Sequence, residues 1–350
     1  MSVKVNIFRK HNPMKLQIEQ NYNLKHLNTF KLDVRAKFFC TLENTEHIRE
    51  ALEFSNNQKT SYLVLSGGSN ILFTHNPQML VMANRIKGLE KIDENNREVI
   101  VQAGSGIIWD DFVKWTVDNN LYGAVNLSFI PGLVGAAPIQ NIGAYGSEAK
   151  DIILGVKYID TNTGEQKTLS NNECRFSYRN SIFKQELKGK AIITSVVFKL
   201  SKEEYYNLNY KALSDAFSNQ APDLKKLRET IGKIRSEKLP SPDKIGNAGS
   251  FFKNPVVDST VLERLKTKFE NIPHYPVEDN KVKLAAGWLI EKAGFKGVRR
   301  GNAGVYEKNA LVLVNYGNAT GGEILSLARE IQDKVEDMFG VRLEPEVNIL

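Results

Sequence analysis

The segment that most restricts how this chain can fold is an uncharged stretch at residues 130–146. None of its seventeen residues is charged, and four of them are glycine. A surface loop of this length normally carries charged side chains, and so many small residues are rarely found in an ordinary turn. The stretch therefore predicts close packing against a flat, partly apolar ligand. A buried structural loop is the alternative.

Two shorter glycine-rich segments suggest related chemistry. At residues 64–72, Gly67 and Gly68 directly follow a predicted strand. A backbone without Cβ atoms can approach a ligand there, and successive N–H groups can bind an anion. At residues 246–255, Ser250 lies beside a glycine and two phenylalanines, which could place its hydroxyl in a desolvated pocket. Ordinary turns, or a capping serine, are the alternatives for both segments.

Two charged residues lie in short polar clusters. Arg179, within residues 177–181, could bind a carboxylate through its bidentate guanidinium. Glu346, within residues 343–347, lies on the last predicted strand. A surface ion pair for Arg179 and a solvated side chain for Glu346 are the commoner explanations when each is considered alone.

The hydrophobic pattern predicts a mixed α+β fold, because helices and strands alternate without a repeating βαβ unit. A domain junction is expected at residues 239–242, where two prolines follow the clearest helix. The predicted helices cover residues 46–57, 107–119, 223–238, 259–269, 282–293 and 322–339. The predicted strands cover residues 61–66, 98–103, 151–160, 165–169, 191–200, 311–314 and 346–350.

Composition and missing motifs exclude several classes of protein. With 350 residues, 41% hydrophobic and 25% charged, the chain suits a globular protein of two or three domains. The net charge of +7 is too dispersed for nucleic-acid binding, and no apolar run could span a membrane. Metal-binding histidine or cysteine pairs, phosphate loops and Rossmann fingerprints are absent from the sequence, so no metal site is expected. Only Cys40 and Cys174 are present and no signal peptide is visible, which predicts a cytoplasmic location.

Taken together, five segments resemble the UDP-N-acetylenolpyruvylglucosamine reductase family, flavoenzymes of peptidoglycan precursor synthesis. The matching segments, in the family's order, are residues 66–72, 130–146, 178–181, 246–255 and 343–347. Residues 208–212 also resemble the tyrosine-bearing loop of the family's longer branch. The resemblance extends from about residue 21 to the last residue. Residues 1–20 match nothing in the family core and read as an extension, with Met14 as a second possible start. We expect deletion of residues 2–13 to leave activity intact.

The resemblance implies a vanillyl-alcohol-oxidase-type (PCMH-type) FAD-binding fold with a separate α/β substrate-binding domain. Its implied divisions are an FAD-binding region at residues 21–90 that is joined by the last strand at 343–350, a second FAD-binding region at 91–234, and the substrate domain at 235–342. The implied contacts with FAD are Gly67, Gly68, Ser69, Asn70, Ile71, Pro131, Gly132, Gly135, Ala136, Ala137, Ile139, Gln140, Asn141, Gly143 and Ala144.

The resemblance also implies an activity, in which NADPH reduces the flavin and the flavin then reduces an enolpyruvyl UDP-sugar. Ser250 resembles the general acid, and Arg179 and Glu346 resemble the pair that stabilises the enol. The implied substrate-binding residues are Tyr210, Lys238, Asn254 and Lys296. A monomer that acts on this small molecule, without nucleic acid or membrane, is expected. A flavin oxidase of the same superfamily and a UDP-sugar sensor are the rival functions.

Overall fold

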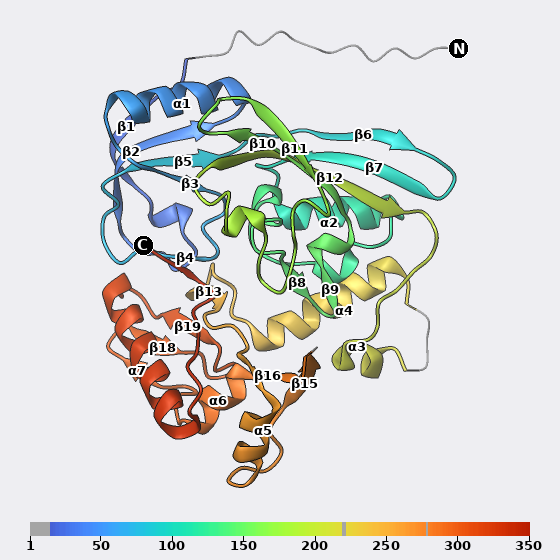
Figure 1. Ribbon diagram of the computed structural model, residues 1–350, viewed down its shortest axis with the longest axis vertical. Coiled ribbons are helices and arrows are strands. Elements are labelled where there is room, and N and C mark those ends of the chain that lie inside the picture. The colour runs from blue at the N-terminus through green and yellow to red at the C-terminus, as the bar shows by residue number, and fades with distance from the viewer. Residues whose placement is uncertain (1–14, 219–221, 278) are drawn as a thin grey trace.

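The computed structural model of the chain describes residues 15–218, 222–277 and 279–350. In Figure 1 the segments up to about residue 210 form the upper part of the molecule, and most of those after about residue 245 form the lower part, with helix α4 (Leu224–Lys238) between them and the C-terminus beside β4. The expectation about deleting residues 2–13, and Met14 as a start, lie outside the described residues.

The first sheet has the strand order β1-β2-β5-β3 and lies at the N-terminal end of the described chain. Strands β2 (Arg35–Leu42), β5 (Leu80–Asn84) and β3 (Tyr62–Leu65) are parallel neighbours, and β1 (Glu19–Asn23) pairs antiparallel with β2. Helix α1 (Thr45–Asn57) connects β2 to β3, and the side chain of Asn44 caps it by accepting from the N–H of His47. This confirms the helix and strand predicted at residues 46–57 and 61–66. The other three strands of the sheet were not predicted.

The second sheet is antiparallel throughout and has the order β11-β10-β12-β7-β6. Helix α2 (Trp109–Asp118) packs against it, where the rings of Phe112 and Phe198 stack with centroids 4.4 Å apart. The four strands predicted in this part are confirmed, and a fifth strand, at residues 89–94, was not predicted. The five strands are β6 (Leu89–Glu94), β7 (Glu98–Gly104), β10 (Ile153–Asp160), β11 (Gln166–Ser170) and β12 (Ala191–Ser201).

Helix α4 is the predicted amphipathic helix, and its apolar face packs against α2 and against α3 (Lys211–Ala216). On its polar side, Arg228 makes two hydrogen bonds to Asp110 of α2, at 2.8 and 2.7 Å. This bidentate pair fixes the helix across the second FAD-binding region that the sequence predicts. Short 3-10 helices occur at Lys25–Leu27, Val125–Leu127, Val134–Ala136 (η3), Ala149–Asp151 and Ile182–Lys184 (η5).

The C-terminal part contains two small antiparallel sheets and three helices. One sheet has the order β13-β19-β18-β17 and the other the order β14-β16-β15. The strands are β13 (Gly246–Ser250), β14 (Val256–Asp258), β15 (His274–Val277), β16 (Lys281–Leu284), β17 (Arg299–Arg300), β18 (Ala303–Val305) and β19 (Val312–Asn315). The helices are α5 (Ser259–Lys266), α6 (Ala286–Lys292) and α7 (Gly321–Phe339).

Three predictions for this part are corrected by the structure. The helix expected at residues 282–293 begins only at Ala286, because Val282 and Leu284 alternate with exposed neighbours as a strand between β14 and β15. The glycine-rich segment at residues 246–255 begins as strand β13 instead of a loop, since it pairs with β19. The strand expected at residues 346–350 is limited to Asn348–Ile349 (β20), so Glu346 lies just before the last strand and not on it.

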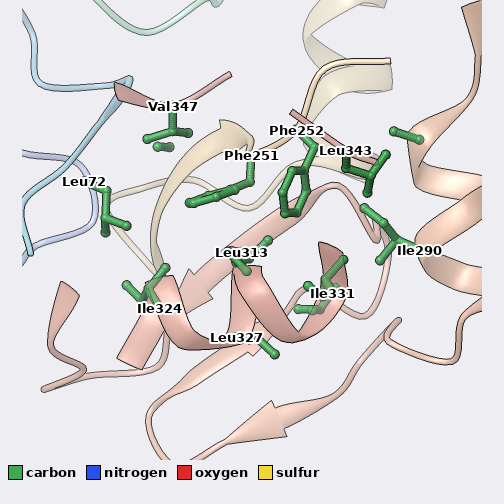
Figure 2. Packing of buried hydrophobic residues seen from close by; sticks show 14 of the residues in the cluster. Leu72, Phe251, Phe252, Ile290, Leu313, Ile324, Leu327, Ile331, Leu343 and Val347 are labelled. Carbon is green, nitrogen blue, oxygen red and sulfur yellow. The ribbon is translucent and has the colours of Figure 1, made fainter. Parts of the chain in front are cut away.

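A single hydrophobic cluster joins the two ends of the chain. The final strand β20 (Asn348–Ile349) pairs in parallel with β4 (Ile71–Leu72), which follows the first glycine loop. Figure 2 shows Val347 and Leu72 beside Phe251, with Phe252 and the α7 residues in the same cluster. This cluster therefore fixes the glycine loop, the segment after Ser250 and the last strand relative to one another. The remaining short strands are β8 (Gly143–Ala144) and β9 (Ser147–Glu148).

Candidate active site

The first glycine loop presents a row of unused backbone donors. Within the described part of the chain, none of the N–H groups of residues 67–70 donates a hydrogen bond. Gly68 has a φ of +62°, and its neighbours hold it so closely that a Cβ would lie 1.9 Å from the carbonyl oxygen of Leu27. A left-handed residue among free N–H groups is the geometry of an anion nest. This loop can therefore bind a phosphate.

The two predicted flavin loops touch each other. The hydroxyl of Ser69 donates to the carbonyl of Pro131 at 2.9 Å. A Cβ on Gly67 would lie 2.9 Å from the Cα of Gly132, closer than real Cβ contacts. The absence of a side chain at Gly67 is thus needed for contact between the loops, a reason that sequence reasoning, which assigned the glycines to ligand approach, did not anticipate.

Some hydrogen-bonding groups of the uncharged stretch are already used within the protein. Residues Val134–Ala136 form η3, and the N–H groups of Gly135, Ala136 and Ala137 donate to carbonyl groups of the protein. Asn141 is fully buried and its side chain bonds to Glu148, to the carbonyl of Ser177 and to the N–H of Lys150. These groups shape the loop from within, whereas Gln140, Gly143 and Ala144 remain partly exposed.

Asn70 connects three of the predicted segments. Its side-chain amide donates to Oε1 of Gln140 at 2.8 Å and to the backbone carbonyl of Glu346 at 3.2 Å. Its own carbonyl accepts from the backbone N–H of Asn348 at 3.1 Å. One side chain thus joins the first glycine loop, the uncharged stretch and the final segment. The sequence placed Asn70 at the flavin, and the structure gives it this connecting role.

Arg179 and Glu346 come together although 167 residues separate them in the sequence (346 minus 179). Nε of Arg179 lies 3.0 Å from Oε1 of Glu346, and the two side chains are only 20% and 13% exposed. Nη2 of Arg179 donates to the carbonyl of Gly143 at 3.0 Å, which fixes the guanidinium against the uncharged stretch. The ion pair lacks hydrogen-bond alignment, so Nε has no hydrogen-bond partner among the described residues.

The surroundings of Glu346 favour its protonated form. Burial raises the pKa of this carboxyl above its ordinary value, and the nearby charges of Arg179, Lys184 and Lys253 oppose that rise. Because the net direction is upward, desolvation outweighs the attraction of three cations. A raised pKa lets the carboxyl keep its proton to a higher pH than an exposed glutamate, and while protonated it can donate a hydrogen bond.

Ser250 lies at the end of β13, one residue before the buried Phe251. The carbonyl of Phe251 accepts from the backbone N–H of Glu346 at 2.7 Å, so the backbones of the serine segment and the glutamate segment are directly joined. The Ser250 hydroxyl is partly exposed and makes no hydrogen bond to any described residue. It is therefore available to a ligand.

The four predicted substrate residues are more scattered. Oδ1 of Asn254 accepts from the N–H of Ala286 at 3.0 Å and so caps α6. Tyr210 is 39% exposed and stacks edge-on against Tyr145 of the uncharged stretch, with centroids 5.2 Å apart. Lys238 is exposed in the last turn of α4, and Lys296 forms an exposed ion pair with Glu291 at 2.9 Å. No contact among the described residues brings either lysine to the Arg179–Glu346 pair.

Sequence reasoning missed four residues around this pair. Lys184 donates to the carbonyl of Arg179, and Lys253 forms an ion pair with Glu344. Tyr178 lies beneath the guanidinium of Arg179, with its ring centroid 5.4 Å from Cζ, and Nζ of Lys283 lies 4.4 Å from the same centroid. Lys253 and Tyr178 belong to segments that the sequence analysis singled out, so the charge of Lys253 and the ring of Tyr178 could have been assigned to the site. Nothing in the sequence around Lys184 or Lys283 indicated a place in the site.

Two further observations concern the rest of the molecule. A cavity of about 560 Å³ lies elsewhere, between residues 25–34, 73–76, 244–246 and 315–321, and none of the predicted site residues lines it. Within residues 15–218, 222–277 and 279–350, no helix is long and apolar enough to cross a bilayer, and no three potential metal ligands cluster together.

The fold and this site together define a flavin-dependent oxidoreductase, and residues 36–170 match the family model "FAD binding domain". Residues 241–350 match the model of the UDP-N-acetylenolpyruvoylglucosamine reductase C-terminal domain. The chain is 45% identical over 339 residues to the reductase of that name from Flavobacterium johnsoniae, covering 96% of this chain and 100% of that protein. With the reductase from Pseudomonas aeruginosa the identity is 42% over the same shares. The chain belongs to the UDP-N-acetylenolpyruvoylglucosamine reductase family.

The fold agrees with a solved structure of this family. The UDP-N-acetylenolpyruvylglucosamine reductase from Thermus caldophilus superimposes with a TM-score of 0.67 and 21% identity, over 96% of this chain and 98% of that one. The predicted fold class, an FAD-binding fold with mixed helices and strands, is confirmed.

The residues of the site also fit FAD. The free N–H groups of residues 67–70 suit a pyrophosphate. The hydroxyl of Ser66 is buried and has no hydrogen-bond partner among the described residues. A polar atom of a bound ligand could supply the missing partner. The uncharged stretch beside this loop suits an apolar ring system. FAD is therefore the cofactor that this chain can hold.

Proposed function

We propose that this chain catalyses the NADPH-dependent reduction of UDP-N-acetyl-3-O-(1-carboxyvinyl)-glucosamine to UDP-N-acetylmuramate, a step of peptidoglycan precursor synthesis. The observation that carries the proposal is the shielded Arg179–Glu346 pair, joined through Asn70 and Gly143 to the flavin loops and through Phe251 to the Ser250 strand. A flavin oxidase would need no such acid and cation, because oxidation of an alcohol or amine protonates no enol.

The chemistry that the residues must assist follows from the substrate. FAD held by residues 67–70 and the uncharged stretch would supply the hydride chemistry, with NADPH as the hydride source and the terminal carbon of the enolpyruvyl double bond as the acceptor. Negative charge then develops on the neighbouring carbon and its carboxylate as an enolate. The protein must stabilise this charge and donate one proton to the carbon.

Arg179 and Glu346 suit the stabilising role. The guanidinium is held by Gly143 and faces a carboxyl whose pKa is raised by burial. Arg179 offers positive charge, and protonated Glu346 offers a hydrogen bond, to the enolic oxygen. By analogy with oxyanion holes, each such preorganised donor contributes about 3–4 kcal/mol to the transition state.

Ser250 suits the role of proton donor. Its hydroxyl is partly exposed, has no hydrogen-bond partner among the described residues and lies on a backbone joined to Glu346. A serine hydroxyl gives up its proton only if nearby positive charge or a proton relay relieves the alkoxide. Lys253, three residues on, is a candidate for that charge.

For the substrate itself, we propose contacts from Tyr210, Lys238, Asn254 and Lys296. Asn254 uses its oxygen to cap α6, which leaves its amide N–H₂ for a ligand. Lys238 forms no ion pair within the described residues, so its ammonium is available to the diphosphate. Lys296 would have to leave Glu291, and exposed ion pairs of this kind are weak.

We also propose the division at residues 90, 234 and 342 for the working enzyme. The separate sheets before and after α4 support the boundary at 234, and the change from the first sheet (last strand β5, ending at Asn84) to the second sheet (first strand β6, from Leu89) supports one near 90. A monomer is supported because one chain supplies all the assigned residues. A cytoplasmic location is supported by the two buried cysteines, which remain free thiols.

Substitution of Ser250 by alanine tests the assignment. We expect NADPH to bleach the flavin at a near-normal rate, while recovery of the flavin on addition of the enolpyruvyl sugar nucleotide slows by about 10²- to 10⁴-fold, the usual contribution of general acid catalysis. Stopped-flow absorbance follows both steps. Ser236→Ala is the matched control, since Ser236 lies exposed on α4 and bonds only to the carbonyl of Lys233. A loss below tenfold would remove Ser250 from this role.

A further inference from the structure

Lys184 is a shielded lysine that the proposed mechanism does not use. It ends the short helix η5, which is capped at its start by the hydroxyl of Ser181, the acceptor for the N–H of Phe183. Its ammonium donates to the backbone carbonyl of Arg179 at 3.2 Å. It forms no ion pair within the described residues. Burial lowers its pKa, with repulsion from Lys253 as the next cause. A shielded cation without an anionic partner needs an explanation in function or in positioning.

The backbone that Lys184 holds is unusual. Residues 177–180 form a tight turn, in which the N–H and carbonyl groups of Ser177 and Asn180 bond to each other at 3.1 Å in both directions. Arg179, inside this turn, has a φ of +54°, a left-handed conformation that a long side chain rarely adopts. The carbonyl of Arg179 is not used by the turn itself. Lys184 binds that carbonyl, so it is placed to stabilise the turn that aims the guanidinium at Glu346.

The charge of Lys184 also acts on Glu346. The groups that face this carboxyl are Arg179 from the turn, Lys184 from η5, Lys253 from the segment after β13, and the phenol of Tyr178. Each of the three cations favours the ionised carboxylate, whereas burial favours the neutral acid. Removing one cation therefore shifts the balance toward the protonated form.

We propose that Lys184 is a positioning residue of this active site: its ammonium holds the Arg179 turn in the conformation that faces Glu346. The inference rests on the function proposed above, because the pair it positions is the one assigned to the enolate. Lys184 acts through Arg179 and Glu346 and has no assigned contact with the substrate.

Three substitutions separate the hydrogen bond from the charge. Lys184→Arg keeps both, Lys184→Gln keeps a donor without charge, and Lys184→Met removes both. Lys190→Met is the control, because Lys190 is exposed on the same segment and its side chain has no described partner. The measurements are flavin recovery by the sugar nucleotide at different pH values, substrate affinity by calorimetry, and the pH dependence of thermal unfolding.

For Lys184→Met we expect flavin recovery to slow about tenfold, while bleaching by NADPH stays within about twofold, because the turn loses its donor. The alkaline limb of recovery, where Glu346 loses its proton, should move up by about half a pH unit or more. Lys184→Gln should show the same shift in the limb with a smaller loss of rate. Lys184→Arg should resemble the wild type.

Three results would overturn the inference. One is recovery and pH limb both unchanged in Lys184→Met. Another is a loss confined to substrate affinity, which would make Lys184 a substrate ligand. The third is disappearance of the alkaline limb, which would mean that Lys184 itself titrates. If the wild type fails to recover with the sugar nucleotide, the proposed function fails instead. The pH dependence of unfolding in Lys184→Met then still reports whether Lys184 acts on Glu346.

Discussion

Substitution of Gly67 by alanine tests the contact between the two flavin loops. Gly67 has no left-handed backbone conformation to lose, so the only new feature is a methyl group. That methyl carbon would lie 2.9 Å from the Cα of Gly132 and 3.4 Å from its carbonyl carbon. Both neighbours are backbone atoms, which cannot rotate away as a side chain can. The loops must therefore separate.

The size of the effect follows from that distance. Carbon atoms pack at about 3.5–4.0 Å, so the loops must move apart by about 0.6–1 Å. This movement stretches the hydrogen bond from Ser69 to Pro131, now 2.9 Å, and displaces the free N–H groups of residues 67–70. Overpacking of this kind costs about 1–3 kcal/mol. If the cost falls on the cofactor site, affinity for FAD drops by about 5- to 150-fold.

The assay is the dissociation constant of FAD, from fluorescence quenching on titration of FAD-free protein, together with the ratio of flavin to protein absorbance after purification. Gly322→Ala is the control, since its methyl group would meet only Oγ1 of Thr320, at 3.9 Å, in the first turn of α7. Circular dichroism checks that both variants fold. A Gly67→Ala protein that binds FAD within twofold of the control would refute the reasoning that this contact shapes the site.

Three other outcomes are expected. The thermal stability of Glu346→Gln should rise relative to that of the wild type between about pH 4 and about pH 8. The raised pKa of Glu346 makes the wild type lose stability as this carboxyl ionises in the folded state, whereas glutamine does not titrate. A melting-temperature difference, variant minus wild type, that falls over this range contradicts the assignment. Burial raises the pKa of both Cys40 and Cys174 to about 12, so neither thiol should react with Ellman's reagent at about pH 8 until the protein is unfolded. Fast reaction of the folded protein would disprove the burial of these thiols. Phe252→Ala should lower the free energy of unfolding by about 3–5 kcal/mol in denaturant titrations, because Phe252 is fully buried in the cluster of Figure 2 and its loss leaves a cavity there. A loss below about 1 kcal/mol would mean that neighbouring side chains move into that cavity.

Local sequence patterns were sufficient to predict the helices that have a clear hydrophobic period and a clear capping residue. Helix α7 directly follows its N-cap Thr320, which forms a capping box with Glu323, and Gly340 in a left-handed conformation follows its last residue. Helix α4 begins at its cap, Asp223. Strand β5 escaped prediction because it is buried at every position, which in a parallel sheet covered on both faces removes the alternation that marks a strand. In strand β2 the alternation is interrupted by the consecutive buried residues Phe38, Phe39 and Cys40. The sequence pattern extends the predicted helix over strand β16 because Val282 and Leu284 lie just before residues that do form a helix.

The sequence by itself determined which residue types were available for the site. These are a glycine pair after a strand, an uncharged stretch, and Arg179, Ser250 and Glu346, in an order typical of the reductase family. Only the tertiary structure decided that Arg179 and Glu346 meet at 3.0 Å, that Asn70 ties three segments together, and that Lys184 holds the Arg179 turn. The physical reason is that capping, turns and periodicity are local interactions, which neighbouring residues specify. The pKa of Glu346 depends on burial and on charges from distant segments, and these exist only once the core has closed around them.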